Sequence, residues 1–117
     1  MVSSVLSSAV TSHDLPTAPF LSAEGGRTVL WLDGEHDIST RFAVSDSLES
    51  AFSANDADVI VDLSQVTFIG AATVDEFVRG WNALRGQSRT LTLRSPSRPA
   101  RRLLDVMGLT DLIEPNE

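Results

Sequence analysis

Hydrophobic and polar positions along the chain follow two periods, which predict strands and helices in turn. The stretch Arg27–Asp33 is rich in β-branched and aromatic residues and predicts a strand. Before it, Phe20–Ala23 predicts a shorter strand that ends at the turn sequence Glu24-Gly25-Gly26. The nearly continuous apolar run Val59–Leu63 is typical of a strand covered on both faces, and the alternation in Arg89–Arg94 predicts one more strand.

Three segments between and after these strands place apolar residues at helical spacing. We expect the first helix to have Asp37 or Ser39 as its N-cap, the second to end at Gly86, and the third to run from a Ser97 cap to Gly108. Their predicted buried faces are Val44, Leu48, Ala51 and Phe52; Val74, Phe77, Val78, Trp81 and Leu84; and Ala100, Leu103, Leu104 and Met107. The order β-β-α-β-α-β-α predicts an α/β domain with a mainly parallel sheet.

The length of 117 residues leaves room for one domain. Residues 1–18 are rich in Ser, Thr and Pro and are expected to form a flexible tail, so that residues 19–117 make up the single domain. No stretch reaches the roughly 18 apolar residues needed to span a bilayer, and the N-terminus lacks the basic region of a signal peptide. We therefore expect a cytoplasmic protein without direct membrane insertion.

Charge is distributed unevenly along the chain, which carries a formal net charge of −7 and has no cysteine and no lysine. Residues 1–78 have a net charge of −10, residues 79–104 of +7 and residues 105–117 of −4. Clustered Arg94, Arg98, Arg101 and Arg102 suggest phosphate contacts, but the acidic balance of the whole chain disfavours nucleic acid. We interpret them as an exposed helix face and expect a protein partner.

Residue patterns that carry chemistry are missing, since the sequence has no cysteine nucleophile, phosphate-binding loop or Ser-His-Asp arrangement. We therefore predict no enzyme activity and no cofactor. Asp33, Glu35, His36 and Asp37 form an acidic cluster that admits a cation site. We favour a solvated loop whose last acid caps a helix, because few further ligands converge, and so predict no metal. Both tryptophans, Trp31 and Trp81, are expected in the core.

Four stretches together resemble the STAS domain family, named for sulfate transporters and anti-sigma factor antagonists. They are Leu32–Asp37, the run Val59–Ile69 with its Asp-Leu-Ser, the helix that follows, and Ser97–Leu112 with its Gly108-Leu109. The resemblance covers about residues 20–115. It implies a STAS-like mixed β-sheet of four to five strands with helices packed on one face.

In free-standing members of this family, the domain binds a serine-kinase-like anti-sigma factor, which phosphorylates a serine in the pattern Asp-Ser-Ser-Gly. That pattern falls here on Gly70-Ala71-Ala72-Thr73, so alanine replaces the acceptor at Ala71. The resemblance implies that the Asp37 loop lies beside this segment. The implied partner-binding surface comprises Asp37, Gly70, Ala71, Ala72 and Thr73, with Asp75 and Glu76 at its rim.

Two questions about this surface stay open in the sequence. Either the protein is a permanently competent binder, or the fixed acids Asp75 and Glu76 imitate the phosphorylated state. We favour the first, because acids in a first helical turn are ordinary partners of the helix dipole. Thr73 is either a displaced phosphoacceptor or the N-cap of a capping box Thr73-Val74-Asp75-Glu76, and we favour the cap.

The hypothesis for function is therefore an anti-sigma factor antagonist that sequesters its anti-sigma factor without phosphorylation at the usual serine. One alternative is a STAS accessory subunit of a membrane transporter for lipids or solutes. Another is a scaffold paralogue without the switch, which would act in assemblies, and a homodimer also stays open.

Overall fold

The computed structural model describes residues 19–115, where strands and helices follow in the predicted order. The elements are β1 (Phe20–Glu24), β2 (Arg27–His36), the 3-10 turn η2 (Ile38–Thr40), α2 (Arg41–Ala54), β3 (Val59–Ile69), α3 (Ala71–Arg85), β4 (Leu91–Arg94), α4 (Arg98–Val106) and the 3-10 turn η3 (Thr110–Leu112). The tail predicted for residues 1–18 lies outside the described residues.

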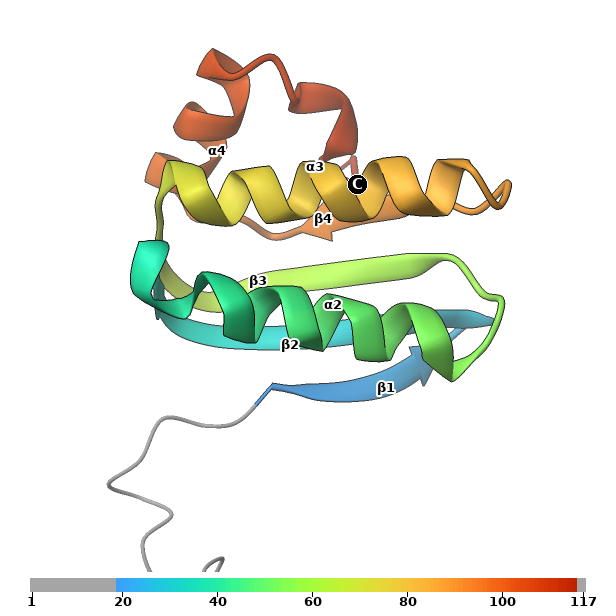
Figure 1. Cartoon of the computed structure of the whole chain (residues 1–117). Coiled ribbons are helices and arrows are strands. Elements are labelled where there is room, and N and C mark those ends of the chain that lie inside the picture. Colours follow the sequence, from blue (N-terminus) through green and yellow to red (C-terminus); the bar gives the residue numbers. More distant parts are fainter. Residues whose placement is uncertain (1–18, 116–117) are drawn as a thin grey trace, which may run out of the picture.

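Within the described residues, the strands form one four-stranded sheet in the order β1-β2-β3-β4 (Figure 1). β1 runs antiparallel to β2, while β2, β3 and β4 run parallel to one another. Gly25 and Gly26, both with positive φ, close the hairpin between β1 and β2. The predicted mixed sheet is therefore confirmed.

β2 and β3 continue well past the ends that the hydrophobic pattern predicts. β2 reaches His36 rather than Asp33, and β3 reaches Ile69 rather than Leu63. Their pairing shifts register twice, between Trp31 and Asp33 and between Gly34 and Glu35. A shift of this kind breaks the alternation of inward and outward side chains, so the sequence no longer signals a strand there.

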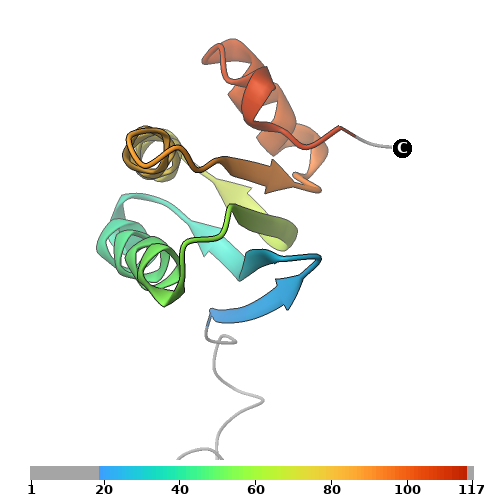
Figure 2. The same ribbon diagram turned by 90° about the vertical axis from the view of Figure 1, so that its right-hand side faces the viewer.

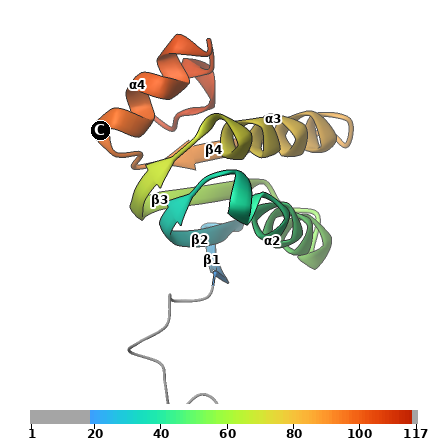
Figure 3. The ribbon, with the colours of Figure 1, turned by 60° about the vertical axis from the view of Figure 1, so that its left-hand side comes forward.

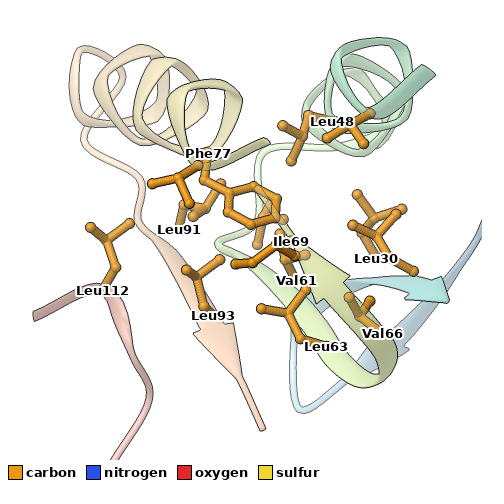
Figure 4. Close-up of a cluster of buried hydrophobic side chains, with 14 of the residues drawn as sticks. Leu30, Leu48, Val61, Leu63, Val66, Ile69, Phe77, Leu91, Leu93 and Leu112 are labelled. Carbon is orange, nitrogen blue, oxygen red and sulfur yellow. The ribbon is translucent and has the colours of Figure 1, made fainter. Parts of the chain in front are cut away.

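Helices α2 and α3 pack against the same face of the sheet (Figure 2). Phe77 of α3 is 1% exposed and lies among buried strand residues that include Val61 and Leu91 (Figure 4). The predicted stripe of α2 is buried at Val44, Leu48 and Ala51. Burial of each large apolar side chain contributes about 1.5–3 kcal/mol, so this layer supplies most of the stability.

α4 lies beside β4 at the edge of the sheet (Figure 1). Ser97 caps it as predicted, since its hydroxyl accepts a hydrogen bond from the Ala100 amide at 3.2 Å. The predicted buried face is only partly correct, because Leu103 is half-buried and Met107 is 38% exposed. After α4, the chain returns to the sheet at a single parallel bridge between Leu93 and Ile113.

α3 ends at Gly86, its C-cap, as predicted, but Gly86 is not the left-handed residue that closes the helix. Gly86 has an ordinary helical φ of −65°, and the left-handed residue is Ser88, with φ of 59°. The Arg89 amide bonds the Leu84 carbonyl at 2.9 Å and the Ser88 amide bonds the Arg85 carbonyl at 3.0 Å. This pair of bonds is a Schellman motif, in which the left-handed residue follows Gly86 by two positions.

On the face opposite α2 and α3, one row of side chains crosses all four strands. Phe20, Trp31, Asp62 and Arg94 are register partners from β1 to β4. Phe20 and Trp31 stack at 5.8 Å between ring centroids, and the Arg94 guanidinium lies 5.3 Å from the Trp31 ring. Trp31 is therefore half-buried on this face, not in the core, whereas Trp81 is half-buried and packs against the core.

Arg94 ties the two edges of the sheet together. Its Nε lies 2.7 Å from an Asp62 oxygen, and its Nη1 lies 2.8 Å from Glu24 on β1. Asp62 also accepts hydrogen bonds from the Ser64 amide at 2.9 Å and hydroxyl at 2.6 Å. Within strand β3, Ser64 thus binds one oxygen of the Asp62 carboxylate, and Arg94 binds the other.

Acid is expected to weaken this network. Burial acts to raise the pKa of Asp62, but hydrogen bonds from Ser64 and Arg94 outweigh it and hold that pKa below 3.8. The unfolded chain thus takes up this proton at a higher pH than the folded chain. The resulting stabilisation is complete above about pH 4.5 and is lost as the pH falls through the folded pKa.

We therefore expect Asp62→Asn to lower the free energy of unfolding at pH 7 by about 1–3 kcal/mol. The variant should also lose less stability than the wild type between neutral and acidic pH. Urea unfolding at several pH values measures both effects. Asp46→Asn, at an exposed position on α2, is the matched control, and an Asp62→Asn profile parallel to the wild type would contradict the assignment.

Candidate functional site

Two connections meet at the carboxyl ends of β2 and β3 (Figure 3). His36 and Ile69 are register partners in the parallel pair, and the Gly70 amide bonds the His36 carbonyl at 2.9 Å. A Cβ on Gly70 would lie 3.8 Å from the Asp37 Cα. The structure thus brings the Asp37 loop and the start of α3 side by side, as the resemblance implied.

The Asp37 loop is held by its own side chains. Asp37 accepts hydrogen bonds from the Ser39 amide at 2.9 Å and hydroxyl at 2.6 Å, which lower the pKa of Asp37. It caps the 3-10 turn that leads into α2, whereas α2 itself has Thr40 as its N-cap, so the predicted cap acts one turn before the helix. Asp37 itself is exposed.

His36 is buried rather than on the surface. Its Nε2 lies 2.8 Å from the Asp33 carbonyl oxygen and its Nδ1 lies 3.0 Å from the Thr40 hydroxyl. Because a carbonyl only accepts, Nε2 carries the proton, and Nδ1 accepts from Thr40 when the ring is neutral. These two bonds orient the loop, which supports the interpretation of this acidic segment as a capping loop.

α3 begins at Ala71, with Gly70 as its N-cap and no side chain capping it. Ala71 is exposed and Ala72 is half-buried. Thr73 is the third residue of the helix and is fully buried, so its predicted role as N-cap is wrong. Gly70, Ala71 and Ala72 carry no periodic signal, and for this reason the pattern places the start of the helix too late.

The hydroxyl of Thr73 has no hydrogen-bond partner although it is buried. Thr73→Val keeps the branched shape and removes an unpaired polar atom, so we expect it to raise the free energy of unfolding by about 1 kcal/mol. A capping threonine would show the opposite sign, with a loss of about 1 kcal/mol. Urea unfolding of the two proteins decides between these outcomes, and Thr90→Val at an exposed position is the control.

Asp75 and Glu76 do not share one environment. Asp75 is exposed, but the Glu76 side chain is 8% exposed and lies 2.6 Å from Arg41 Nε on α2. Arg79 Nε lies 3.9 Å from the same carboxylate. Glu76 therefore joins α2 to α3 instead of standing at the rim of the surface. Its charge is balanced locally, which weakens the idea that these two acids imitate a phosphate.

Exposed apolar side chains that the sequence pattern did not single out lie at the carboxyl ends of β2 and β3 and at the start of α2, and one of them, Phe68, lines a hollow with Ala71. Ile38 is 66% exposed, Phe42 is 81% exposed and Phe68 is 51% exposed. We call these three residues with Ala71 the Ala71 surface. Phe42 is two residues before Val44 and so lies on the other side of the helix from the buried stripe. This spacing could have identified Phe42 as exposed.

The Ala71 surface has two hollows lined by apolar and charged side chains. Ile38 and Phe42 line a shallow hollow with Arg41 and Arg79, and Phe68 and Ala71 line a second one with Pro99 and Leu103. Exposed aromatic and branched apolar side chains next to charged residues are typical of protein-binding sites.

Within residues 19–115, every helix is too short or too polar to span a bilayer.

Comparisons with known proteins agree with this geometry. A family model described as Mlab, STAS domain, matches residues 20–114. A search of curated protein sequences gave no match.

Solved structures with a similar fold include two anti-sigma factor antagonists. SpoIIAA of Bacillus in its unphosphorylated form has a TM-score of 0.65 and is 18% identical, over 86% of this chain and 89% of that one. An antagonist from Mycobacterium paratuberculosis has a TM-score of 0.72 and is 20% identical, over 85% of this chain and 87% of that one.

A sulfate transporter family protein from Wolinella succinogenes also shares the fold. Its TM-score is 0.62 and it is 16% identical, over 80% of this chain and 75% of that one. At identities this low, the structural likeness shows that the fold is the same. The function has to be inferred from the candidate site. The family model covers nearly all of the described residues, and the chain therefore belongs to the STAS domain family.

Proposed function

We propose that this protein is a regulatory binding domain that acts as an anti-sigma factor antagonist. It sequesters a serine-kinase-like anti-sigma factor in the cytoplasm, through the Ala71 surface and the neighbouring Asp37 loop. This follows the anti-sigma factor antagonists among the solved structures with the same fold. It acts by binding and carries out no chemical step of its own.

The observation that supports this proposal is the position of Ala71. It is the first residue of α3, it is exposed, and it lines an apolar hollow with the exposed Phe68. A phosphate at this position would place about −1.5 to −2 charges beside that apolar hollow. Alanine accepts no phosphate, so the surface keeps its apolar character and binding is permanent.

Thr73 does not replace the missing acceptor in this proposal. Its side chain is fully buried, so a kinase would have to unwind the first turn of α3 to reach the hydroxyl. Glu76 likewise does not supply a substitute charge, because Arg41 neutralises it. The protein is thus a binder that ATP does not release.

The experiment is capture of partners on the immobilised protein from a lysate of the host, with and without ATP, followed by their identification. A kinase-like anti-sigma factor retained equally under both conditions supports the proposal. Release of that factor by ATP would contradict the absence of a switch. A transporter subunit in its place would favour the accessory-subunit alternative, which the sulfate transporter relative also suggests.

A further inference from the structure

α4 carries two apolar stripes that face different surroundings. Ala100 and Leu104 are buried against the domain. Pro99, Leu103 and Val106, at helical spacing on another side, line an outward-facing groove of about 430 Å³, and Val106 is 79% exposed. Leu103 packs partly against the core, but within residues 19–115 the outer part of this stripe at Pro99 and Val106 stays exposed.

This groove continues into the Ala71 surface. Pro99 and Leu103 also line the neighbouring hollow of about 320 Å³ that reaches Phe68 and Ala71. We call the continuous strip formed by Phe68, Ala71, Pro99, Leu103 and Val106 the α4 groove. Figure 3 shows α4 and the start of α3 at the same end of the molecule.

The groove is bordered by positive charge that no ion pair within the described residues neutralises. Arg98 and Arg102, one helical turn apart, line it and are exposed. The ion pairs formed within residues 19–115 use Arg27, Arg41, Arg79 and Arg94, and none of them uses an arginine of α4. These guanidinium groups are free to bind carboxylates in a geometry that pairs two N–H donors with two oxygens.

We propose that the α4 groove binds an acidic amphipathic helix of the partner protein. Apolar residues of that helix at i, i+3, i+4 and i+7 would fill the groove, and its flanking carboxylates would meet Arg98 and Arg102. The inference rests on the proposed function, because it assigns to the anti-sigma factor the segment that lies beside Ala71. An anionic bilayer is a poorer occupant, because its extended surface would also meet the acids that give the whole chain a net charge of −7, whereas a single helix meets chiefly the groove.

A synthetic peptide tests the chemistry of the groove directly. The probe is a labelled 18-residue helix with leucines on one face and glutamates beside them, titrated with the full chain by fluorescence anisotropy. We expect binding that weakens at least tenfold in Arg98→Glu/Arg102→Glu and several-fold in Val106→Ser. Arg85→Glu, at an exposed arginine of α3, is the matched control and should bind like the wild type.

A second peptide, with lysine in place of every glutamate, tests whether the sign of the peptide's charge determines binding. It should bind the wild type at least tenfold more weakly and should recover binding to Arg98→Glu/Arg102→Glu. Equal binding of both peptides, or binding insensitive to the double reversal, would overturn the proposal. Phosphatidylglycerol vesicles that bind where the peptide does not would assign the groove to lipid. A wild-type dimer that Val106→Glu turns into a monomer would assign it to a second copy.

Binding of the captured anti-sigma factor to the variants distinguishes failure of the groove inference from failure of the proposed function. If Ala71→Glu releases the factor but Arg98→Glu/Arg102→Glu binds it like the wild type, the groove inference fails and the proposed function stands. If the glutamate peptide binds as expected but no anti-sigma factor is captured, the groove is supported and the proposed function fails. Thermal unfolding of each variant establishes that the fold is intact.

Discussion

Ala71→Glu is expected to weaken binding of the anti-sigma factor by about 100-fold, which corresponds to about 2.7 kcal/mol. The substitution places a long charged side chain at the centre of the Ala71 surface, where a partner would have to desolvate it. The fold should not suffer, because Ala71 is exposed and a carboxylate at the first residue of a helix interacts favourably with its dipole. Calorimetric titration with the captured factor measures the affinity, and thermal unfolding verifies the fold.

Ala83→Glu is the matched control for this prediction. It makes the same change at another exposed position of α3, three turns further along, and should leave the affinity within about twofold. An equal loss in both variants would show that charge on the helix, and not the Ala71 surface, decides binding.

Ala71→Ser adds the complementary result. It restores a hydroxyl at the exposed first residue of α3, so a kinase-type partner should phosphorylate it and then dissociate in the presence of ATP. Phosphate incorporation in Ala71→Ser and not in the wild type would support the proposed switch-free binding. A wild type that incorporates phosphate to the same extent would contradict it.

Arg89→Met is expected to destabilise the domain by about 3 kcal/mol, the largest stability effect of any exchange considered for this chain. Arg89 is 7% exposed, and its guanidinium closes the C-terminal end of α2. It donates to the Phe52 carbonyl at 3.2 Å, to the Asn55 carbonyl at 2.9 Å and to the Ala57 carbonyl at 2.8 and 3.0 Å. Methionine fills the space of the stem but leaves these carbonyl groups without their donor.

Urea unfolding at neutral pH measures this loss, and Arg89→Lys should lie between the wild type and methionine because one ammonium cannot reach all three carbonyls. Arg85→Met is the control. Arg85 is exposed and lies 4.7 Å from the centre of the Trp81 ring, an interaction that contributes less than about 1 kcal/mol. A loss in Arg89→Met no larger than in this control would contradict the structural role.

The hydrophobic pattern was sufficient for the order of the elements. Val44, Leu48 and Ala51 repeat at helical spacing, and Val59–Leu63 forms an apolar run, because each element must bury one side of itself in the core. Local caps and turns could also be predicted from the sequence, as at the Ser97 cap and the Gly25-Gly26 turn. These features depend on residues close together in the chain.

The position of the candidate site could be predicted from the sequence, but the burial and exposure of its side chains could not. The resemblance to the STAS family placed Asp37 beside Gly70, and the parallel pairing of β2 with β3 explains why they meet. The sequence did not show that Thr73 is buried, because its environment depends on where α3 begins. Nor did it show the apolar Ala71 surface, since exposure of Phe42 follows from which side of α2 the sheet covers.

By itself, then, the sequence determined the alternation of strands and helices, the mixed sheet and the absence of a hydroxyl at Ala71. Only the tertiary structure decided which charges are neutralised. Arg41 and Glu76 are 35 residues apart and Arg94 and Glu24 are 70 apart, yet each pair is in contact. Contacts over such separations depend on the register of the strands and on how the helices pack. A local pattern of hydrophobic and polar residues specifies neither the strand register nor the packing of the helices.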